Sequence, residues 1–261
     1  MTARVTAPVV YAMKGSGKRI VCLTAYDVTS AAIASEAGVD VVLVGDSLGN
    51  TVLGYDSTLP VTVDEVCHHL RAVRRAVNGP LLVADMPFGS YNECVPDGVR
   101  NAVRLMKDGA EAVKLEGDYP DVCAALVKAG IPVMAHVGFT PQSVHLFGGH
   151  RVQGKGDGAN QVLAVAKRME QAGAFAVVVE LVPAEFAALL TAELTMPTIG
   201  IGAGPHCDGE IQVFHDVMGL SDRVYRHARA FTNGRSSFKR AAKAYAVAVR
   251  GGSFPGPENS A

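Results

Sequence analysis

Short apolar runs alternate with segments of helical periodicity along most of this chain. The runs are continuously apolar, as in 19–25 (RIVCLTA), which is typical of parallel strands covered on both faces. The segments between them carry apolar residues at helical spacing, and several end in glycine just before the next run, as at Gly38, Gly109 and Gly173. This regular alternation predicts a parallel sheet in which a helix follows each strand.

The same pattern sets the bounds of the expected elements. About eight strand–helix units predict an α/β protein with a single (β/α)8 barrel domain over 1–261, in which 251–261 form a mobile tail. A doubly wound open sheet is the alternative, but no G-x-G-x-x-G turn follows the first run. Strands are expected at 19–25, 40–44, 81–84, 112–115, 132–135, 175–179, 197–201 and 211–214, and helices at 30–38, 62–78, 95–109, 121–130, 160–173, 183–194 and 236–249.

Composition narrows the class of protein. The 261 residues are 49% hydrophobic with a formal net charge of -1, which suits one large core and argues against nucleic acid as a partner. No apolar run approaches the ~18 residues that a membrane span needs. The five cysteines are scattered singly, which argues against a zinc ribbon and suits a reducing compartment. We therefore expect a soluble, cytoplasmic protein with no nucleic-acid or membrane partner.

Acidic residues follow or end three consecutive strands. Asp46, Asp85 and Glu116 stand at the ends of the second, third and fourth apolar runs. The active site of a (β/α)8 barrel lies at the carboxyl ends of its strands, so these carboxylates are expected to meet there. Oxygen ligands without a His or Cys cluster suit Mg²⁺ or Mn²⁺. Each acid also has a structural interpretation, as a cap or turn residue, but their coincidence favours a metal site.

Two further polar residues share these strand ends. Lys114 stands two positions before Glu116, so both side chains lie on one face of a strand. A buried pair of this kind is costly unless it is paired or binds something, and a structural ion pair is the alternative interpretation. His136, after the fifth strand, fits a satisfied polar core residue as well as a site residue. Asp27 fits turn chemistry as well as function.

The chemistry of such a site follows from the cation. A 2-oxo acid offers Mg²⁺ one carboxylate oxygen and one keto oxygen, and polarisation of the ketone acidifies the adjacent C–H, giving a metal-stabilised enolate. Glu180, alone at the end of an apolar strand (AVVVELVP), is the candidate base, with a salt bridge or helix-terminal acid as the alternative. The glycine-rich segment 138–158 is long enough for a lid or a subunit contact, and an ordinary surface loop is its alternative.

Several motifs, taken in order from about Lys18 to Leu220, closely resemble the ketopantoate hydroxymethyltransferase family. The resemblance implies a (β/α)8 barrel of the phosphoenolpyruvate/pyruvate superfamily that acts in pantothenate biosynthesis. The motifs are VGDSLG at 44–49, DMPF at 85–88, VKLEG at 113–117, HVGFTPQ at 136–142 and IGIGAG at 199–204.

The resemblance also implies a reaction and roles for individual residues. A hydroxymethyl group passes from 5,10-methylenetetrahydrofolate to 3-methyl-2-oxobutanoate, giving 2-dehydropantoate, in a homo-oligomer that is typically a decamer. By residue matching, three acids bind Mg²⁺, two residues hold the carboxylate of the oxo acid, one glutamate accepts the proton, and a histidine supports the site. These are Asp46, Asp85 and Glu116 for the metal, Ser47 and Lys114 for the carboxylate, Glu180 for the proton, and His136 in support. The residues expected to bind the substrate are Asp46, Ser47, Asp85, Lys114 and His136.

The chain departs from the family pattern at His150, Glu210 and Phe139, where tyrosine, glutamine and leucine are usual. None of these is a proposed metal ligand or the base. Two other functions compete with the transferase. A C–C lyase of the isocitrate-lyase or phosphoenolpyruvate-mutase type carries a Lys-x-x-Cys-Gly-like loop, which this chain lacks. A non-catalytic barrel would be expected to lose some site acids, yet all are present.

Overall fold

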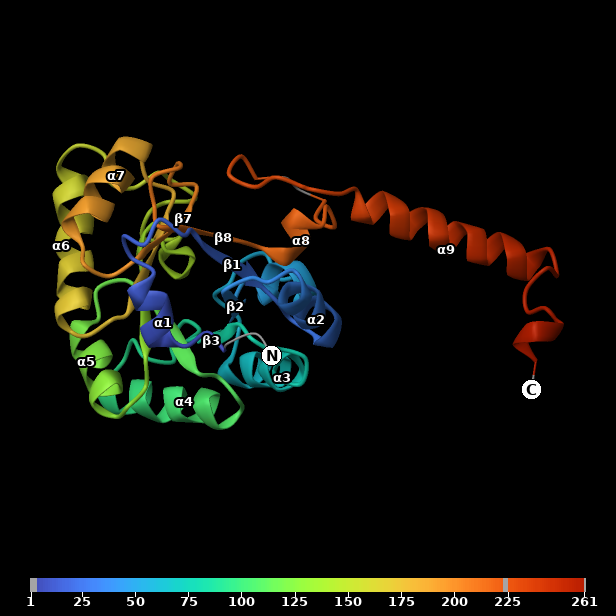
Figure 1. Cartoon of the computed structure of the whole chain (residues 1–261), viewed down its shortest axis with the longest axis horizontal. Helices are drawn as coiled ribbons and strands as arrows, with labels where there is room; N and C mark the ends of the chain where they lie inside the picture. Colours follow the sequence, from blue (N-terminus) through green and yellow to red (C-terminus); the bar gives the residue numbers. More distant parts are fainter. Residues whose placement is uncertain (1–3, 223–224, 261) are drawn as a thin grey trace. The chain divides into compact units, whose positions relative to one another are not determined.

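The computed structural model describes residues 4–222 and 225–260. Eight parallel strands follow one another in chain order and close into a barrel, because the last strand pairs with the first (Figure 1). The predicted (β/α)8 barrel is therefore confirmed. The strands are β1 (Ile20–Thr24), β2 (Val41–Val44), β3 (Leu81–Asp85), β4 (Ala112–Glu116), β5 (Val133–Gly138), β6 (Ala176–Glu180), β7 (Thr198–Ile201) and β8 (Gly209–Gln212).

Helices follow each of the first six strands. A short π-helix, η1 (Gly49–Leu53), precedes the helix after β2, and a 3₁₀ turn, η2 (Pro141–Ser143), precedes the one after β5. Thr62 caps the helix after β2, and Glu65 completes its capping box. In the described residues no helix is long and apolar enough to cross a membrane. The barrel helices are α2 (Val28–Glu36), α3 (Val63–Arg74), α4 (Val95–Lys107), α5 (Pro120–Lys128), α6 (Asp157–Gln171) and α7 (Ala184–Glu193).

One expectation needs correction, and one open alternative gains a structural answer. The eighth strand runs over Gly209–Gln212, not 211–214, and Phe214 already begins the next helix. Gly209 resembles a turn residue in the sequence, but it pairs with Ile20 of β1, and glycine is needed there because a Cβ would lie 2.4 Å from the carbonyl oxygen of Ile20. Asp27 is the N-cap of α2, where its carboxylate accepts from the Ser30 amide at 2.7 Å. Its structural interpretation was therefore the right one.

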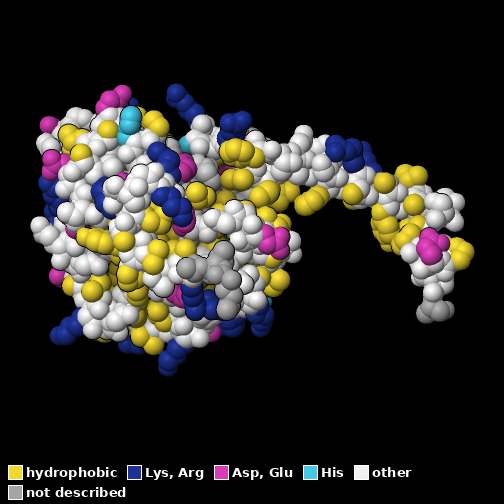
Figure 2. Space-filling view, in the orientation of Figure 1, with side chains coloured by type: hydrophobic (Ala, Val, Ile, Leu, Met, Phe, Trp, Pro, Cys, Tyr) yellow, Lys and Arg dark blue, Asp and Glu magenta, His cyan; other side chains and the backbone are white. Residues whose placement is uncertain are grey.

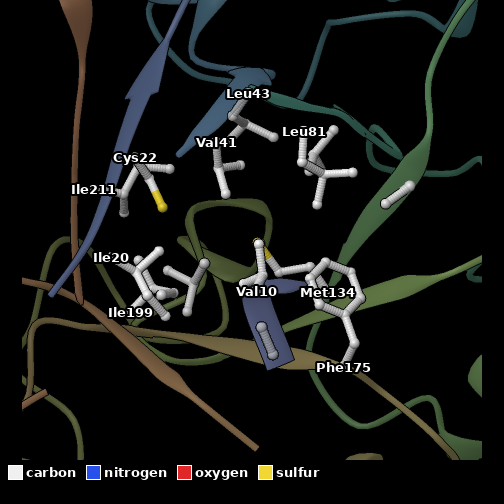
Figure 3. Close-up of a cluster of buried hydrophobic side chains, with 14 of the residues drawn as sticks. Val10, Ile20, Cys22, Val41, Leu43, Leu81, Met134, Phe175, Ile199 and Ile211 are labelled. Atoms are coloured by element: carbon white, nitrogen blue, oxygen red, sulfur yellow. The ribbon is translucent and has the colours of Figure 1, made fainter. Parts of the chain in front are cut away.

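Apolar side chains on the inward face of the strands fill the barrel towards the end where the strands begin, which is called its lower end. Figure 3 shows Ile20, Cys22, Val41 and Leu43 in this cluster, together with Val10 from α1 (Ala7–Ala12). The helix α1 adds Ala7 and Val10 to the same cluster, so it lies against the lower end of the core. Because side chains on a strand alternate between faces, the polar site residues stand on this inward face two or more positions further along each strand.

Residues Phe214–Ala261 form a second compact unit, distinct from Met1–Val213. It contains α8 (Phe214–Val217), α9 (Gly234–Arg250) and a 3₁₀ turn, η3 (Pro257–Asn259), within the expected tail. None of the α9 side chains is buried, and Figure 2 shows hydrophobic and basic side chains along it. The helix predicted at 236–249 is present, whereas one domain over 1–261 and mobility of 251–261 stay predictions.

Candidate active site

The strand register places oppositely charged residues side by side at the carboxyl end of the barrel. Asp85 on β3 is the register partner of Lys114 on β4, and Glu116 is the partner of His136 on β5. The Lys114 ammonium lies 2.5 Å from Asp85 Oδ1 and 3.5 Å from Glu116 Oε1. All four residues are buried. The face-sharing of Lys114 and Glu116 that the sequence predicted is therefore present, within a larger cluster.

His136 joins this cluster to Glu180. Its Nδ1 lies 3.1 Å from Glu116 Oε1, and its Nε2 lies 3.3 Å from Glu180 Oε2. Glu180 is the last residue of β6, and its side chain keeps 13% of its surface exposed. The histidine is thus a buried polar residue with acidic partners, and these partners include the candidate base. Its assignment as a supporting site residue stays a prediction.

Asp46 enters the site through a tight turn after β2. Its backbone N–H donates to Asp85 Oδ2 at 3.0 Å. The preceding residue, Gly45, has no room for a side chain, because a Cβ there would lie 2.9 Å from Ser47 Oγ and 3.3 Å from Asp85 Oδ2. Ser47 Oγ lies 2.8 Å from the hydroxyl of the buried Tyr26. The turn therefore brings Asp46 to the acids and sets Ser47 beside a tyrosine that the sequence did not single out as a site residue.

Two loop residues complete the cluster, and the sequence gave neither of them a role. Gln142, in η2, donates from its side chain to Asp46 Oδ2 at 2.9 Å and from its backbone to Glu116 Oε2 at 3.0 Å. The hydroxyl of Tyr91, which follows β3, lies 2.7 Å from Gln142 Oε1 and accepts from the Glu116 amide at 3.0 Å. Both side chains are buried. Gln142 stands inside a motif that the resemblance used, and this was the one available signal for it.

The electrostatics of the cluster oppose negative charge on two of its three metal-type acids, Asp46 and Asp85. Burial, and then the nearby Asp85 and Glu116 carboxylates, raise the pKa of Asp46 well above its usual value. Burial also raises the pKa of Asp85, although Lys114 opposes the shift. Burial acts against Glu116 too, but Lys114 and His136 outweigh it and lower its pKa to about 2.

The two cationic groups respond to these acids in the opposite sense. Burial opposes the charge of His136, yet Glu116 and Glu180 raise its pKa to about 9. Asp85 and Glu116 likewise raise the pKa of Lys114 against the effect of burial. Four carboxylates thus face two cations, which leaves an excess of two negative charges when all six groups are ionised.

This donor set suits a hard divalent cation. The three acids expected to bind metal provide oxygen donors only, and a divalent cation among them would offset the mutual repulsion that raises the pKa of Asp46. In the part of the chain that the structure describes, no three His, Cys, Asp or Glu side chains form a ready metal site. In this arrangement the Lys114 ammonium contacts oxygens of Asp85 and Glu116, and the Gln142 amide contacts one of Asp46. The metal-binding roles of the acids stay predictions.

A pocket of about 510 Å³ borders the cluster. Glu116 and Gln142 line it, so its wall is shared with the acids. Its other walls come from the loops after β3, β4 and β5 and from the first half of α6. The segment 138–158 therefore serves the site at two places, through Gln142 in the cluster and through further residues in the pocket.

Relatives with about 50% sequence identity match nearly the full length of the chain. A 3-methyl-2-oxobutanoate hydroxymethyltransferase from Moorella thermoacetica is 51% identical over 263 residues, covering 99% of this chain and 98% of the relative. One from Leifsonia xyli subsp. xyli is 52% identical over 253 residues, covering 95% of this chain and 91% of the relative. Both similarities extend over the barrel and into the second unit.

Solved structures of much lower identity share the fold. A phosphonopyruvate hydrolase in complex with oxalate and Mg²⁺ has a TM-score of 0.62 at 16% identity, covering 98% of this chain and 93% of that one. A phosphoenolpyruvate phosphomutase from Streptomyces platensis subsp. rosaceus has a TM-score of 0.64 at 15% identity, covering 95% and 88%. The sequence profile described as Ketopantoate hydroxymethyltransferase matches residues 4–257. With its acid cluster at the carboxyl end of a closed barrel, the chain belongs to the ketopantoate hydroxymethyltransferase family.

Proposed function

We propose that this enzyme transfers a hydroxymethyl group from 5,10-methylenetetrahydrofolate to 3-methyl-2-oxobutanoate, giving 2-dehydropantoate for pantothenate biosynthesis. The names of relatives at about 50% identity support the reaction and the acceptor. The buried cluster that runs from Asp85 through Lys114, Glu116 and His136 to Glu180 is the observation that carries the proposal. It places the Lys114 ammonium, carboxylates suited to a metal ion and the partly exposed Glu180 together at the carboxyl end of the barrel.

Magnesium is the cofactor that this donor set fits. Asp46, Asp85 and Glu116 would hold it, directly or through water. When bound, it polarises the ketone of the oxo acid and makes the neighbouring C3–H more acidic. The ammonium of Lys114 contacts Asp85. When the metal binds, Lys114 would therefore have to share Asp85 with it. Lys114 and Ser47 then bind the carboxylate of the oxo acid.

Glu180 removes the single proton on C3. Its partial exposure lets it reach a substrate, and His136 fixes the orientation of its carboxylate. The carbanion takes the methylene unit of the donor, whose bonds from that carbon to nitrogen are broken. The hydroxyl oxygen of the product comes from water, and the donor leaves as tetrahydrofolate. The reaction is therefore balanced with one water consumed and no redox change.

Product formation tests the proposal. The chain is incubated with 3-methyl-2-oxobutanoate and methylenetetrahydrofolate, with Mg²⁺ or with a chelator, and 2-dehydropantoate is measured. We expect product only with Mg²⁺. Absence of product under both conditions would refute the transferase. Cleavage of 2-oxo acids with Mg²⁺ but without the folate would favour a C–C lyase instead.

We also propose that the chain forms a homo-oligomer, a decamer as the family resemblance implies, and acts in the cytoplasm. The exposed apolar and basic side chains of α9 provide a surface that such an assembly would cover. Light scattering coupled to size exclusion measures the mass of the particle in solution. A monomeric mass near 27.2 kDa would contradict the oligomer.

A further inference from the structure

We propose that the pocket beside the acid cluster binds the pteridine ring system of the one-carbon donor. This inference rests on the proposed function, because it names the place of the second substrate in that reaction. The pocket shares Glu116 and Gln142 with the cluster, so a ligand in the pocket lies against the residues that hold the acceptor site. A transferase of this kind binds its two substrates next to each other, and the pocket adjoins the acid cluster.

Aromatic side chains from three separate loops line the pocket. Phe88 and Tyr91 come from the loop after β3, Tyr119 from the loop after β4, and Phe147 from the loop after β5. The rings of Tyr91 and Tyr119 meet edge to face, with centroids 5.1 Å apart. Flat aromatic ligands are bound by stacked and edge-to-face contacts of this kind. The lining therefore suits a planar ring better than a small branched acid.

Apolar side chains at the same pocket are exposed. Phe88 keeps 50% of its surface exposed, and Leu146 keeps 84%. Large apolar side chains gathered at the edge of a pocket indicate a binding surface more often than chance exposure does. A bound ring system would cover both of them. The 2-oxo acid would not, because its partners lie among the buried charges.

The polar groups of the pocket are mainly neutral. The side-chain amides of Asn92, Gln153 and Gln161 line it, and Asn92 Nδ2 donates to the Tyr119 hydroxyl at 3.0 Å. Amides offer both donors and acceptors, which match the alternating ring nitrogens, amino group and carbonyl of a pterin. The volume of about 510 Å³ falls within the range of about 300–1,000 Å³ typical of sites for ligands of this size.

Binding can be tested without turnover, because the chain contains no tryptophan. Phe88→Trp places a single fluorescent reporter at the pocket. The matched control is Leu189→Trp on α7, which replaces a side chain of the same 50% exposure that does not line the pocket. Titration with tetrahydrofolate is expected to quench the tryptophan fluorescence of Phe88→Trp saturably. The fluorescence of Leu189→Trp should fall only because the ligand absorbs light. Equal responses, or none, would overturn the assignment of the pocket.

Kinetics provide a second test. Phe88→Ala should raise the KM for methylenetetrahydrofolate about tenfold and the KM for the oxo acid by less than about twofold, with Leu189→Ala as control. Unchanged KM values for both substrates would overturn the inference. The two proposals fail separately. Saturable quenching of Phe88→Trp fluorescence in a chain that forms no product would refute the reaction but retain the pocket. Product formation without saturable quenching, and with unchanged KM values in Phe88→Ala, would retain the reaction but refute the pocket.

Discussion

The side-chain amide of Gln142 donates to Oδ2 of Asp46 at 2.9 Å, across 96 positions of sequence. The backbone of the same residue donates to Glu116. One loop residue thus sets the orientation of two acids that come from different strands. Loss of a group that orients a metal-binding carboxylate commonly lowers metal affinity by about 10- to 100-fold.

Replacement of Gln142 by leucine removes the amide from Asp46 and keeps the side-chain volume. We expect Mg²⁺ affinity to fall by about 10- to 100-fold, because the carboxylate loses the donor that orients it. Calorimetric titration with Mg²⁺ measures the change without turnover. The control is Gln171→Leu at the exposed end of α6. Equal affinities in the two variants would contradict the orienting role.

Glu180→Gln tests the base. The amide keeps the shape of the side chain but cannot accept the C3 proton, so exchange of that proton in deuterated water should fall by at least about 100-fold. Proton NMR of 3-methyl-2-oxobutanoate with enzyme and Mg²⁺, but no folate, follows this exchange. Glu185→Gln, on the exposed part of α7, is the control of equal charge change. Exchange at the unaltered rate would remove Glu180 from this role.

Mg²⁺ should stabilise the folded chain. The carboxylates of the cluster are brought together only in the folded state, so Mg²⁺ should bind the folded chain and not the unfolded one. Metal at one hundred times its dissociation constant should then add about 2.7 kcal/mol to the free energy of unfolding. Thermal unfolding with Mg²⁺ and with chelator measures this. Asp46→Asn should reduce the response, whereas Asp56→Asn, at an exposed position, should keep it. A response that persists in full in Asp46→Asn would exclude this aspartate as a ligand.

Gly138→Ala should be strongly destabilising. Gly138 has a φ of +90°, and a Cβ there would lie 2.3 Å from the carbonyl oxygen of Glu180. We expect a loss of about 2–4 kcal/mol from strain and overpacking, with activity falling further because Glu180 is displaced. Urea unfolding and exchange assays measure the two effects. Gly130→Ala has comparable strain (φ +83°) with nothing within 4 Å, so it should lose stability without a selective loss of activity.

The cysteines should differ sharply in reactivity. Cys94 is exposed, whereas Cys22, Cys67, Cys123 and Cys207 are buried. Burial raises the pKa of Cys67 and Cys123 to about 12, so hardly any thiolate is present at pH 8. Mass spectrometry after brief alkylation of the native protein should show one label, on Cys94. Rapid labelling of Cys67 or Cys123 would show that the helices covering them open readily.

Much of the site could be predicted because its residues belong to strands. Asp85, Lys114, Glu116 and Glu180 stand on or at the ends of apolar runs, and alternation along a strand places them on the inward face. Barrel closure then brings the strand ends together. Fold and candidate residues therefore follow from local pattern, while the family resemblance provides the proposed reaction.

The loop contributions could not be predicted in the same way. Gln142 and Tyr91 act through hydrogen bonds that span 96 and 51 positions, and no periodicity encodes such contacts. The eighth strand was misplaced because Gly209 has no side chain to contribute to an apolar pattern. Its place in the sheet depends on close backbone packing against Ile20.

The packing of α1 against the lower end of the barrel also has a consequence for how ligands reach and leave the site. Val10 and Ala7 lie with the strand residues in one apolar cluster, whose described members include no carboxylate, amine, imidazole or hydroxyl side chain. In the proposed reaction, both substrates, both products and the proton taken from C3 would therefore use the opposite opening. With the donor in the proposed pocket, the smaller oxo acid would have to enter first, so the closed end of the barrel predicts a compulsory order of binding.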